Sequence, residues 1–235
     1  MSLDERIERA RRLLAGVEKN HSPAALASSF GAEDMVVLDL IARDGLAIRV
    51  FTLDTGRLPR ETHHLIATVR KHYGIAVDVY TPWPESVDAF VEQHGIDGFY
   101  AGVEQRKACC TVRKVEPLRR ALSGRRGWIT GLRRDQSDTR AELAETALDP
   151  VHGLWKFSPL ADWSDANVWA YLRENRVPYN ALHDRGYPSI GCEPCTRAVK
   201  PGEHPRAGRW WWEQDGARKE CGLHEIPVRV LEKVA

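Results

Sequence analysis

The sequence predicts an α/β fold built on a mainly parallel, doubly wound sheet. Short apolar or alternating segments at residues 24–28, 47–54 and 75–82 have the length and side chains of strands. Segments with helical periodicity separate them, and those at 32–45 and 60–74 end in Gly, as helices often do. Strands that alternate with helices of this length indicate parallel crossovers. A chain of 235 residues is therefore expected to form a single domain, residues 1–235.

The remaining elements follow in order along the chain. Residues 1–20 predict an N-terminal helix, whose apolar side chains fall on one stripe: Ile7, Ala10, Leu14 and Val17. Further helices are expected at 85–95, at 111–124 with Pro117 as a start or a kink, and at 165–175 behind an N-cap at Ser164. A buried strand is expected at 127–132.

The character of the chain changes after residue 176. The sequence becomes rich in Gly, Pro, Arg and Trp, which is typical of an irregular segment that carries function. We expect this segment to belong to the same domain and residues 200–235 to form a mobile C-terminal tail.

Composition narrows the function classes. A net charge of +1 gives no global field for nucleic acid or an anionic membrane. The charged N-terminus is not a secretory signal, and no run of about 18 apolar residues predicts a membrane span. Five cysteines without a signal indicate the reducing cytoplasm, where clustered cysteines bind metal or act in catalysis more often than they form disulfides.

Two polar Gly turns lie at the predicted carboxyl ends of neighbouring strands. They are "SSFGAED" at 28–34 and "LDTGR" at 53–57, and neither is a Walker A or a dinucleotide motif. Either turn alone is more often a plain connection. Ligands of open α/β sheets bind at this edge, however, so the two together favour a nucleotide site.

Four of the five cysteines form two close pairs, Cys109 with Cys110 and Cys192 with Cys195. A structural zinc ion would have to take both adjacent thiolates, which strains the chain. A [4Fe–4S] cluster offers each thiolate its own iron. Inert buried thiols are a third interpretation. We rank the cluster above zinc, and zinc above inert thiols.

The fifth cysteine, Cys221, stands alone in "KECGLH" beside Lys219. Nearby cations lower a thiol pKa, so Cys221 is a candidate nucleophile, although a stray exposed thiol is a fair competitor. Upstream, Arg206 and Arg209 would share one side of a helix. They could bind an anion, form a solvated basic face over Trp210–Trp212, or do both.

From Ser28 to His224 the chain resembles the assimilatory, thioredoxin-dependent adenylyl-sulfate (APS) reductases of the PAPS reductase family. The resemblance rests on seven motifs in order: "SSFGAEDMV", "LDTGRLPRET", "RKACCTVRKVEPL", "GLRRDQSDTR", "GCEPCTR", "RAGRWWW" and "KECGLH". It implies a Rossmann-like adenine nucleotide α-hydrolase fold. It also implies reduction of APS to sulfite and AMP by thioredoxin, in sulfate assimilation and cysteine biosynthesis.

The resemblance also implies residue roles. One [4Fe–4S] cluster per chain would be held by Cys109, Cys110, Cys192 and Cys195. Cys221 would attack the sulfur of APS and become an S-sulfocysteine, which thioredoxin then cleaves. The phosphosulfate would meet Lys114, Arg206, Arg209 and His224, with help from Arg133 or Arg134. The nucleotide would be framed by Ser28, Ser29, Gly31, Asp54, Thr55, Gly56 and Arg57.

Two other functions stay open on sequence. The nearest alternative is a PAPS reductase or a dual APS/PAPS reductase. The resemblance argues against it, because the PAPS-using branch of the family lacks the cysteine pairs. A zinc-stabilised adenine-nucleotide-binding protein without turnover is the non-enzymatic alternative. The sequence leaves the oligomeric state open, a homo-oligomer included.

Overall fold

A computed structural model describes residues 1–137, 140–213 and 223. Its centre is a six-stranded sheet in the order β3-β2-β1-β4-β6-β5. The strands are β1 (Ala24–Ala27), β2 (Arg49–Leu53), β3 (Val77–Tyr80), β4 (Gly127–Ile129), β5 (Thr146–Asp149) and β6 (Leu154–Phe157). All neighbouring pairs are parallel except β5 with β6. The predicted fold class, mainly parallel and doubly wound, is confirmed.

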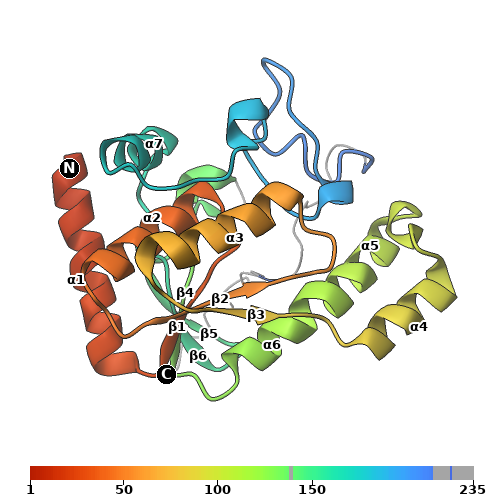
Figure 1. Ribbon diagram of the computed structural model, residues 1–235, viewed down its shortest axis with the longest axis horizontal. Coiled ribbons are helices and arrows are strands. Elements are labelled where there is room, and N and C mark those ends of the chain that lie inside the picture. The colour runs from red at the N-terminus through yellow and green to blue at the C-terminus, as the bar shows by residue number, and fades with distance from the viewer. Residues whose placement is uncertain (138–139, 214–222, 224–235) are drawn as a thin grey trace, which may run out of the picture.

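One face of the sheet carries the larger hydrophobic core. It is covered by α1 (Leu3–His21), α2 (Ala32–Arg43), α3 (Arg60–Tyr73) and α7 (Asp165–Glu174), which lie together in Figure 1. Alternate strand residues such as Leu26, Val50 and Ile129 face these helices. The predicted N-cap of α7 is also confirmed, because the Ser164 side chain accepts a hydrogen bond from the Asn167 N–H.

The opposite face packs against a smaller apolar cluster, which includes Phe51 and Trp128 from the sheet. Its helical members, Leu118, Ala121 and Leu122, all come from α6 (Glu116–Leu122). Before α6 the chain runs through α4 (Pro84–His94), η1 (Gly98–Tyr100), α5 (Val103–Cys110) and η2 (Thr111–Val115), on the right of Figure 1. Short 3₁₀ segments complete the fold: η3 (Arg134–Gln136), η5 (His183–Arg185) and η6 (Glu193–Cys195).

Two features depart from the expected elements. The helix expected at 111–124 is the second half of a longer helical run that begins with α5, with Pro117 inside the first turn of α6. The hairpin of β5 and β6 adds an antiparallel edge that the sequence analysis did not identify. β5 is exposed over most of its length, so it has no alternation of buried and exposed residues to detect.

A buried carboxylate fixes the carboxyl edge of the sheet. Asp34, in the first turn of α2, accepts hydrogen bonds from the Ser29 N–H and hydroxyl at 2.6 and 2.7 Å. Its other oxygen accepts the Gly131 N–H at 3.1 Å, just past β4. Only Gly fits at 131, since a Cβ there would lie 2.4 Å from the Asp34 carboxylate. Asp34 therefore ties the turn after β1 to the end of β4.

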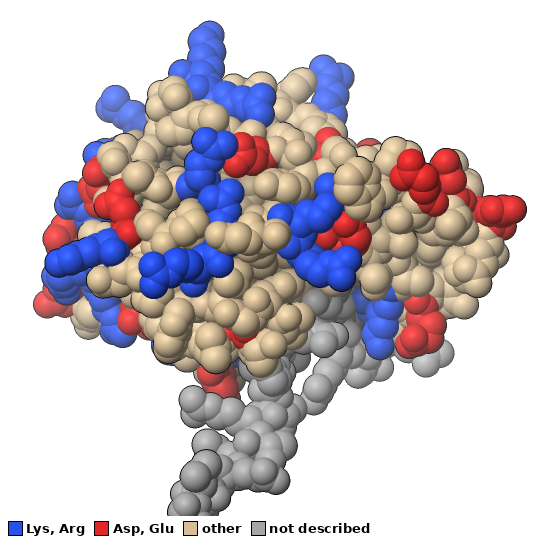
Figure 2. All heavy atoms as spheres, turned by 90° about the horizontal axis from the view of Figure 1, so that it is seen from below, with Lys and Arg blue, Asp and Glu red and all other residues tan. Residues whose placement is uncertain are grey.

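The described surface is mixed in charge. Figure 2 shows Lys and Arg interspersed with Asp and Glu on one face of the molecule. In the described part of the chain, no helix combines the length and apolar character needed to cross a bilayer.

Asp34 gives a pH-dependent stability that can be measured. Burial raises its pKa from 3.8 to about 6, against the lowering effect of the Ser29 and Gly131 hydrogen bonds. The folded state therefore holds this proton more tightly, so its contribution to stability is complete at acidic pH and is lost as the pH rises through about 6. Relative to Asp34→Asn, wild-type stability should fall by about 1 kcal/mol from about pH 5 to about pH 7.5 in urea unfolding.

The matched control is Asp88→Asn, at an exposed position of α4. That variant should follow the wild-type pH profile. Parallel profiles for wild type and Asp34→Asn would show that Asp34 does not titrate in this range.

Candidate active site

The two cysteine pairs, distant in sequence, line one small pocket. Cys109, Cys110, Cys192 and Cys195 share it with Arg57, Phe99, Arg106, Arg113, Lys114 and Pro194. All four thiol side chains are buried. The pocket lies next to the loop that follows β2, at the carboxyl edge of the sheet. The structure therefore brings the four predicted ligands together where a ligand of an open α/β sheet is expected.

The vicinal pair is placed by an irregular helix. Cys109 and Cys110 are the last residues of α5, and the chain continues through the π-helical η2 into α6. A π turn inside an α-helix carries an extra residue and occurs frequently at functional sites. Here it is formed by the segment that contains Arg113 and Lys114, which both line the cysteine pocket.

The loop after β2 connects both cysteine segments. The Thr55 hydroxyl lies 3.2 Å from the Cys192 thiol, and the Thr55 carbonyl accepts a 2.7 Å hydrogen bond from Arg113. The Arg57 carbonyl accepts the Glu193 N–H at 2.8 Å. Gly56 between them has a φ of +69°, a conformation that Gly adopts without strain. This loop was predicted to frame a nucleotide, and in the structure Thr55 and the Arg57 carbonyl contact the cysteine segments.

The thiols differ in electrostatic environment. Burial acts against the ionised form of Cys192, but the charge of Lys114, the Thr55 hydroxyl and the charges of Arg209 and Arg113 outweigh it and lower the Cys192 pKa. Burial raises the pKa of Cys195 to about 12, with Cys192 adding to the effect. Burial also raises the Cys109 pKa, against the influence of Arg113. Among these three thiols, only Cys192 has its pKa lowered by the neighbouring cations.

A buried ion pair supports the far side of the pocket. Arg106 donates to both carboxylate oxygens of Glu213 at 2.8 and 3.1 Å, and both side chains are almost fully buried. The Arg106 guanidinium also lies 4.5 Å from the ring centre of Trp210, and the backbone N–H of Trp210 donates to the Cys195 carbonyl. Residues 210–213 are therefore bound to α5 and to the second cysteine pair together.

Arg209 is a buried cation with an unsatisfied donor. Its Nε atom is buried and has no hydrogen-bond partner among the described residues, and its guanidinium lies 4.8 Å from the Trp210 ring centre. A Cβ at position 191 would lie 2.2 Å from an Arg209 nitrogen, so Gly191 makes room for it. Arg206 is half-buried in the same turn and accepts the Arg209 N–H through its carbonyl. A buried donor without a partner is costly, and an anionic ligand would satisfy it.

The thiol arrangement can be compared with the two metal interpretations. Within residues 1–137, 140–213 and 223, no three His, Cys, Asp or Glu side chains are grouped to hold one metal ion. The four thiols nonetheless line a single pocket among apolar side chains and cations. Four buried thiols of this kind could each bind a different iron of one polynuclear cluster.

The predicted nucleotide residues after β1 lie in a tight turn. The Ser28 N–H donates to the Phe51 carbonyl, and the Ser28 hydroxyl accepts the Phe30 N–H at 3.1 Å. Phe30 has a φ of +60°. Gly31 is the N-cap of α2 and provides no side-chain cap. The first amide groups of the helix, which have no partner within it, point toward the carboxyl edge of the sheet. Ser29 is held by Asp34, as described above.

The predicted residues of the second turn have internal partners. One Asp54 carboxylate oxygen accepts the Gly56 N–H at 2.9 Å, and the other lies 3.0 Å from His63 Nε2. The Arg57 guanidinium donates to the Ile96 carbonyl and lies over the Phe99 ring, 4.8 Å from its centre. Arg57 thus contacts the α4–η1 connection.

Arg133 and Arg134 point in different directions. Arg133 is buried and donates to Glu33 at 2.8 and 2.9 Å, with Asp165 3.3 Å away. Arg134 is exposed. Arg133 therefore lies inside the protein at the carboxyl edge and is already neutralised, which sequence alone did not reveal.

The predicted nucleophile Cys221 and its neighbour His224 lie outside the described residues. Between them Leu223 is described, and it packs half-buried against the apolar cluster under α6.

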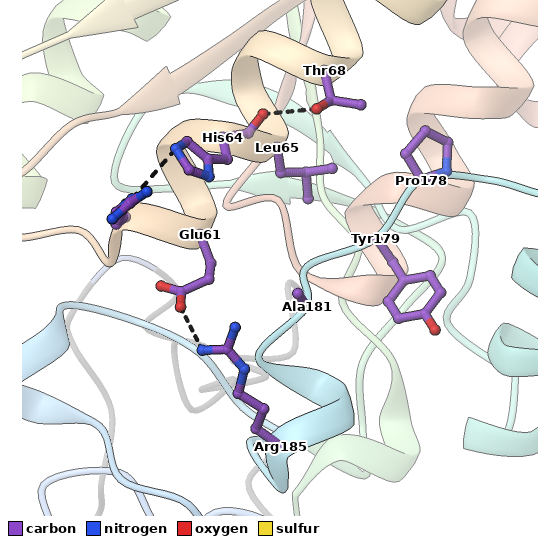
Figure 3. A pocket seen from close by; sticks show the side chains of 9 residues that line it. Glu61, His64, Leu65, Thr68, Pro178, Tyr179, Ala181 and Arg185 are labelled. Atoms are coloured by element: carbon purple, nitrogen blue, oxygen red, sulfur yellow. Dashed lines mark hydrogen bonds and ion pairs between the residues drawn. The ribbon is translucent and has the colours of Figure 1, made fainter.

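A larger pocket, of about 520 Å³, lies elsewhere (Figure 3). It is formed by α3 and residues 178–185, and an ion pair of 2.7 Å joins Arg185 to Glu61 across it. Its lining, as far as the structure describes the chain, includes neither a cysteine nor any other residue of the predicted site.

Sequence reasoning did not identify Asp34, Arg106, Arg113, Gly131 or Glu213. Their roles depend on contacts with distant segments, so the local pattern carries no signal for Arg106 and Glu213. Arg113 stands next to Lys114 in the cysteine motif, and that position was a usable signal.

Comparison with known proteins agrees with this geometry. Residues 23–198 match the phosphoadenosine phosphosulfate reductase domain. The chain is 54% identical over 223 residues to adenosine 5'-phosphosulfate reductase of Allochromatium vinosum, covering 95% of this chain and 87% of that protein. It is 48% identical over 225 residues to the enzyme of that name from Neisseria meningitidis serogroup B, covering 95% and 91%.

Solved structures give the same fold. Phosphoadenylyl-sulfate (PAPS) reductase from Candida auris, in a phosphate complex, has a TM-score of 0.69 at 27% identity, covering 84% of this chain and 96% of that one. An FMN adenylyltransferase from Candida glabrata has a TM-score of 0.58 at 14% identity, covering 86% and 68%, and shares the fold alone. The fold is therefore the Rossmann-like adenine nucleotide α-hydrolase type, and the chain belongs to the phosphoadenosine phosphosulfate reductase family.

Proposed function

We propose that this protein reduces adenosine 5'-phosphosulfate (APS) to sulfite and AMP with electrons from thioredoxin, in the cytoplasm, as a step of sulfate assimilation and cysteine biosynthesis. The observation that carries the proposal is the convergence of both cysteine pairs and Lys114 on one pocket at the carboxyl edge of a nucleotide-binding fold. Relatives named adenosine 5'-phosphosulfate reductase, near 50% identity over most of the chain, support the substrate.

We propose that the four thiols are the ligands of one [4Fe–4S] cluster. The donors would be the thiolates of Cys109, Cys110, Cys192 and Cys195, which are buried, come from two segments and lie among cations that offset their negative charge. When bound, the cluster would order these segments and add to the electrostatics around Lys114, while the two reducing equivalents would come from the thioredoxin dithiol.

The bond changes involve Cys221. Its thiolate attacks the sulfur of APS, a sulfur–sulfur bond forms, and the sulfur–oxygen bond to AMP breaks, so that the electron pair leaves with the AMP phosphate. One thioredoxin thiolate then attacks the Cys221 sulfur and expels sulfite. The second thioredoxin thiol resolves the mixed disulfide, which returns Cys221 as a thiolate and leaves thioredoxin oxidised.

The basic residues make the first step feasible. A thiolate is repelled by the three oxygens of the sulfonate, so the site must neutralise that charge and the charge that develops on AMP. Lys114 lines the cysteine pocket, and Arg209 has a buried donor that no residue in the described part of the chain accepts. With Arg206 and His224 they would bind the phosphosulfate. Arg133 is held by Glu33, so Arg134 is the more available of that pair to contact substrate.

The nucleotide would occupy the turns that follow β1 and β2. The uncapped amides of α2 behind Gly31 suit an anionic or polar group of the ligand. Ser28, Ser29, Asp54, Thr55, Gly56 and Arg57 build these turns, and their internal hydrogen bonds set the backbone conformation that a nucleotide would meet.

Metal analysis tests the cofactor. Protein purified without oxygen should be brown and should contain about four irons and four sulfides per chain. Cys109→Ser should lose most of both. Cys221→Ser is the matched control, and it should keep the cluster because Cys221 is not one of its ligands. One tightly bound zinc without sulfide would contradict the assignment and favour the zinc-stabilised binding protein.

The nucleophile is tested by trapping its adduct. Wild-type protein given APS without thioredoxin should gain one sulfonate on the peptide that contains Cys221, as measured by mass spectrometry. Cys221→Ser should form no sulfite while it still binds AMP in calorimetry. A sulfonate on another cysteine would show that the role of Cys221 is wrong.

Substrate choice follows from the placement of arginines. PAPS adds a 3'-phosphate of about −1.5 to −2 charge, which needs its own cations. Arg43 is paired with Asp39, Arg49 with Asp78, and Arg57 donates to the Ile96 carbonyl. Arg60 lines the larger pocket on α3. We expect kcat/KM for APS to exceed that for PAPS by at least about a hundredfold.

Steady-state assays of both substrates with one thioredoxin measure this ratio. Comparable values would mean that a cation of this chain serves the 3'-phosphate and that the enzyme is dual-specific.

A further inference from the structure

The ring of Trp210 is contacted by two guanidinium groups. The Arg106 guanidinium lies 4.5 Å from the ring centre, and the Arg209 guanidinium lies 4.8 Å from it. All three side chains are buried. A cation is attracted to the face of an indole, but two cations at one ring repel each other in surroundings that water screens poorly. The arrangement therefore needs negative charge beside it.

Only one of these two cations has a carboxylate partner among the described residues. Glu213 accepts two hydrogen bonds from Arg106, at 2.8 and 3.1 Å, and the two side chains are only 2% and 1% exposed. Arg209 forms no ion pair within the described part of the chain, and its buried Nε has no acceptor there. A buried cation without a partner is costly, and an anionic ligand would supply the missing charge.

Trp210 has a backbone conformation that a bulky residue disfavours. Its φ is +43°, in the left-handed region, where an indole side chain strains the backbone. Such a conformation persists only where the surrounding contacts hold it. On one side they come from the second cysteine segment, because the Trp210 N–H donates to the Cys195 carbonyl at 3.1 Å and Thr196 forms a β-bridge with Arg209.

On the other side, Arg106 of α5 binds both ends of one turn. The Glu213 N–H donates to the Trp210 carbonyl at 2.9 Å, which closes a turn over residues 210–213. The Arg106 guanidinium contacts the ring at the first position of this turn and the carboxylate at the last. The strained turn is therefore held by a side chain from a distant part of the sequence, three residues before Cys109.

The direction of the Arg209 side chain depends on this ring. Gly191 confines the guanidinium closely, since a Cβ at position 191 would lie 2.2 Å from an Arg209 nitrogen. The Trp210 ring is a second contact of the same guanidinium. A shift of the ring would therefore let Arg209 move within the site.

We propose that Arg106 and Glu213 are positioning residues for the anion site. They hold Trp210 in its strained conformation, and the Trp210 ring then directs the buried donor of Arg209 toward the phosphosulfate of the nucleotide. The identity of this anion rests on the proposed function, whereas the position of Arg209 does not.

A purely structural role of the ion pair is the alternative. Apolar side chains of similar volume can often replace a buried ion pair without loss of stability. Such a replacement therefore separates the two roles, because it can keep the fold while it removes the guanidinium from the Trp210 ring.

The test combines Arg106→Met with Glu213→Leu in the anaerobic holoprotein. This double variant should keep its melting temperature and its iron. Phenylglyoxal should modify Arg209 at least about tenfold faster than in wild type, as measured by mass spectrometry of its peptide, because the side chain is no longer held in place. The Kd for AMP in calorimetry should rise at least about tenfold, because Arg209 is misplaced.

The matched control removes an exposed ion pair by the same substitutions, Arg49→Met with Asp78→Leu. This pair, 2.6 Å long, lies at the start of β2, and its loss should change neither measurement. Arg106→Lys is the conservative variant. It keeps a charge for Glu213 but lacks the planar group that stacks on the ring, so both of its values should lie between those of wild type and the double variant.

Two outcomes would overturn the proposal. One is wild-type reactivity of Arg209 and wild-type affinity for AMP in a double variant that is folded and contains iron. If the double variant does not fold or loses its iron, Arg106→Lys decides, and wild-type values in that variant are the second outcome. Modification of Arg209 requires no turnover, so a protein that releases no sulfite from APS would contradict the proposed function alone.

Discussion

The site depends on the hydrogen bonds of one residue, Thr55, at the end of β2. Its hydroxyl contacts the Cys192 thiol and its carbonyl accepts from Arg113, one turn beyond the vicinal cysteines. The neighbouring Arg57 carbonyl binds the backbone of the second cysteine segment. The parallel sheet fixes the position of this loop, and the loop fixes the distance between two cysteine pairs that are far apart in sequence. The Arg106–Glu213 ion pair and the backbone bond from Trp210 to Cys195 hold the same two segments together from the other side.

Buried charge is the second constraint. Arg106 and Glu213 are nearly inaccessible to water, and such a pair costs desolvation that its hydrogen bonds only partly repay. The pair instead fixes position, because it binds α5 to the turn that carries Arg209 and Trp210. Arg209 then lies near Cys192 and Cys195 with a donor that no described residue accepts. A fold that stabilises a buried, incompletely bonded cation is well suited to an anionic ligand.

Local patterns in the sequence predicted the main elements. The helical stripe of α1, the β-branched β2 and the Gly that ends α3 each determine their element through neighbouring residues. The cysteine pairs were also identified, because two adjacent cysteines are a distinctive feature in a chain that has only five. Three contacts were not predictable from the sequence. They are the ion pair of Arg133 with Glu33, the hydrogen bond from Gly131 to Asp34, and the ion pair of Arg106 with Glu213. Each depends on a partner that only the folded chain brings near, and β5 lacks any periodicity because most of it is exposed.

The central claim is that both cysteine pairs bind one cluster, with the Thr55 loop holding them in place. X-ray absorption of the anaerobic protein at the iron and zinc edges tests it most directly. The account predicts iron with sulfur neighbours and short iron–iron distances in the wild-type protein. The iron–iron signal should be lost in Cys192→Ser and kept in Cys221→Ser. A zinc spectrum with sulfur neighbours and no metal–metal distance would contradict it.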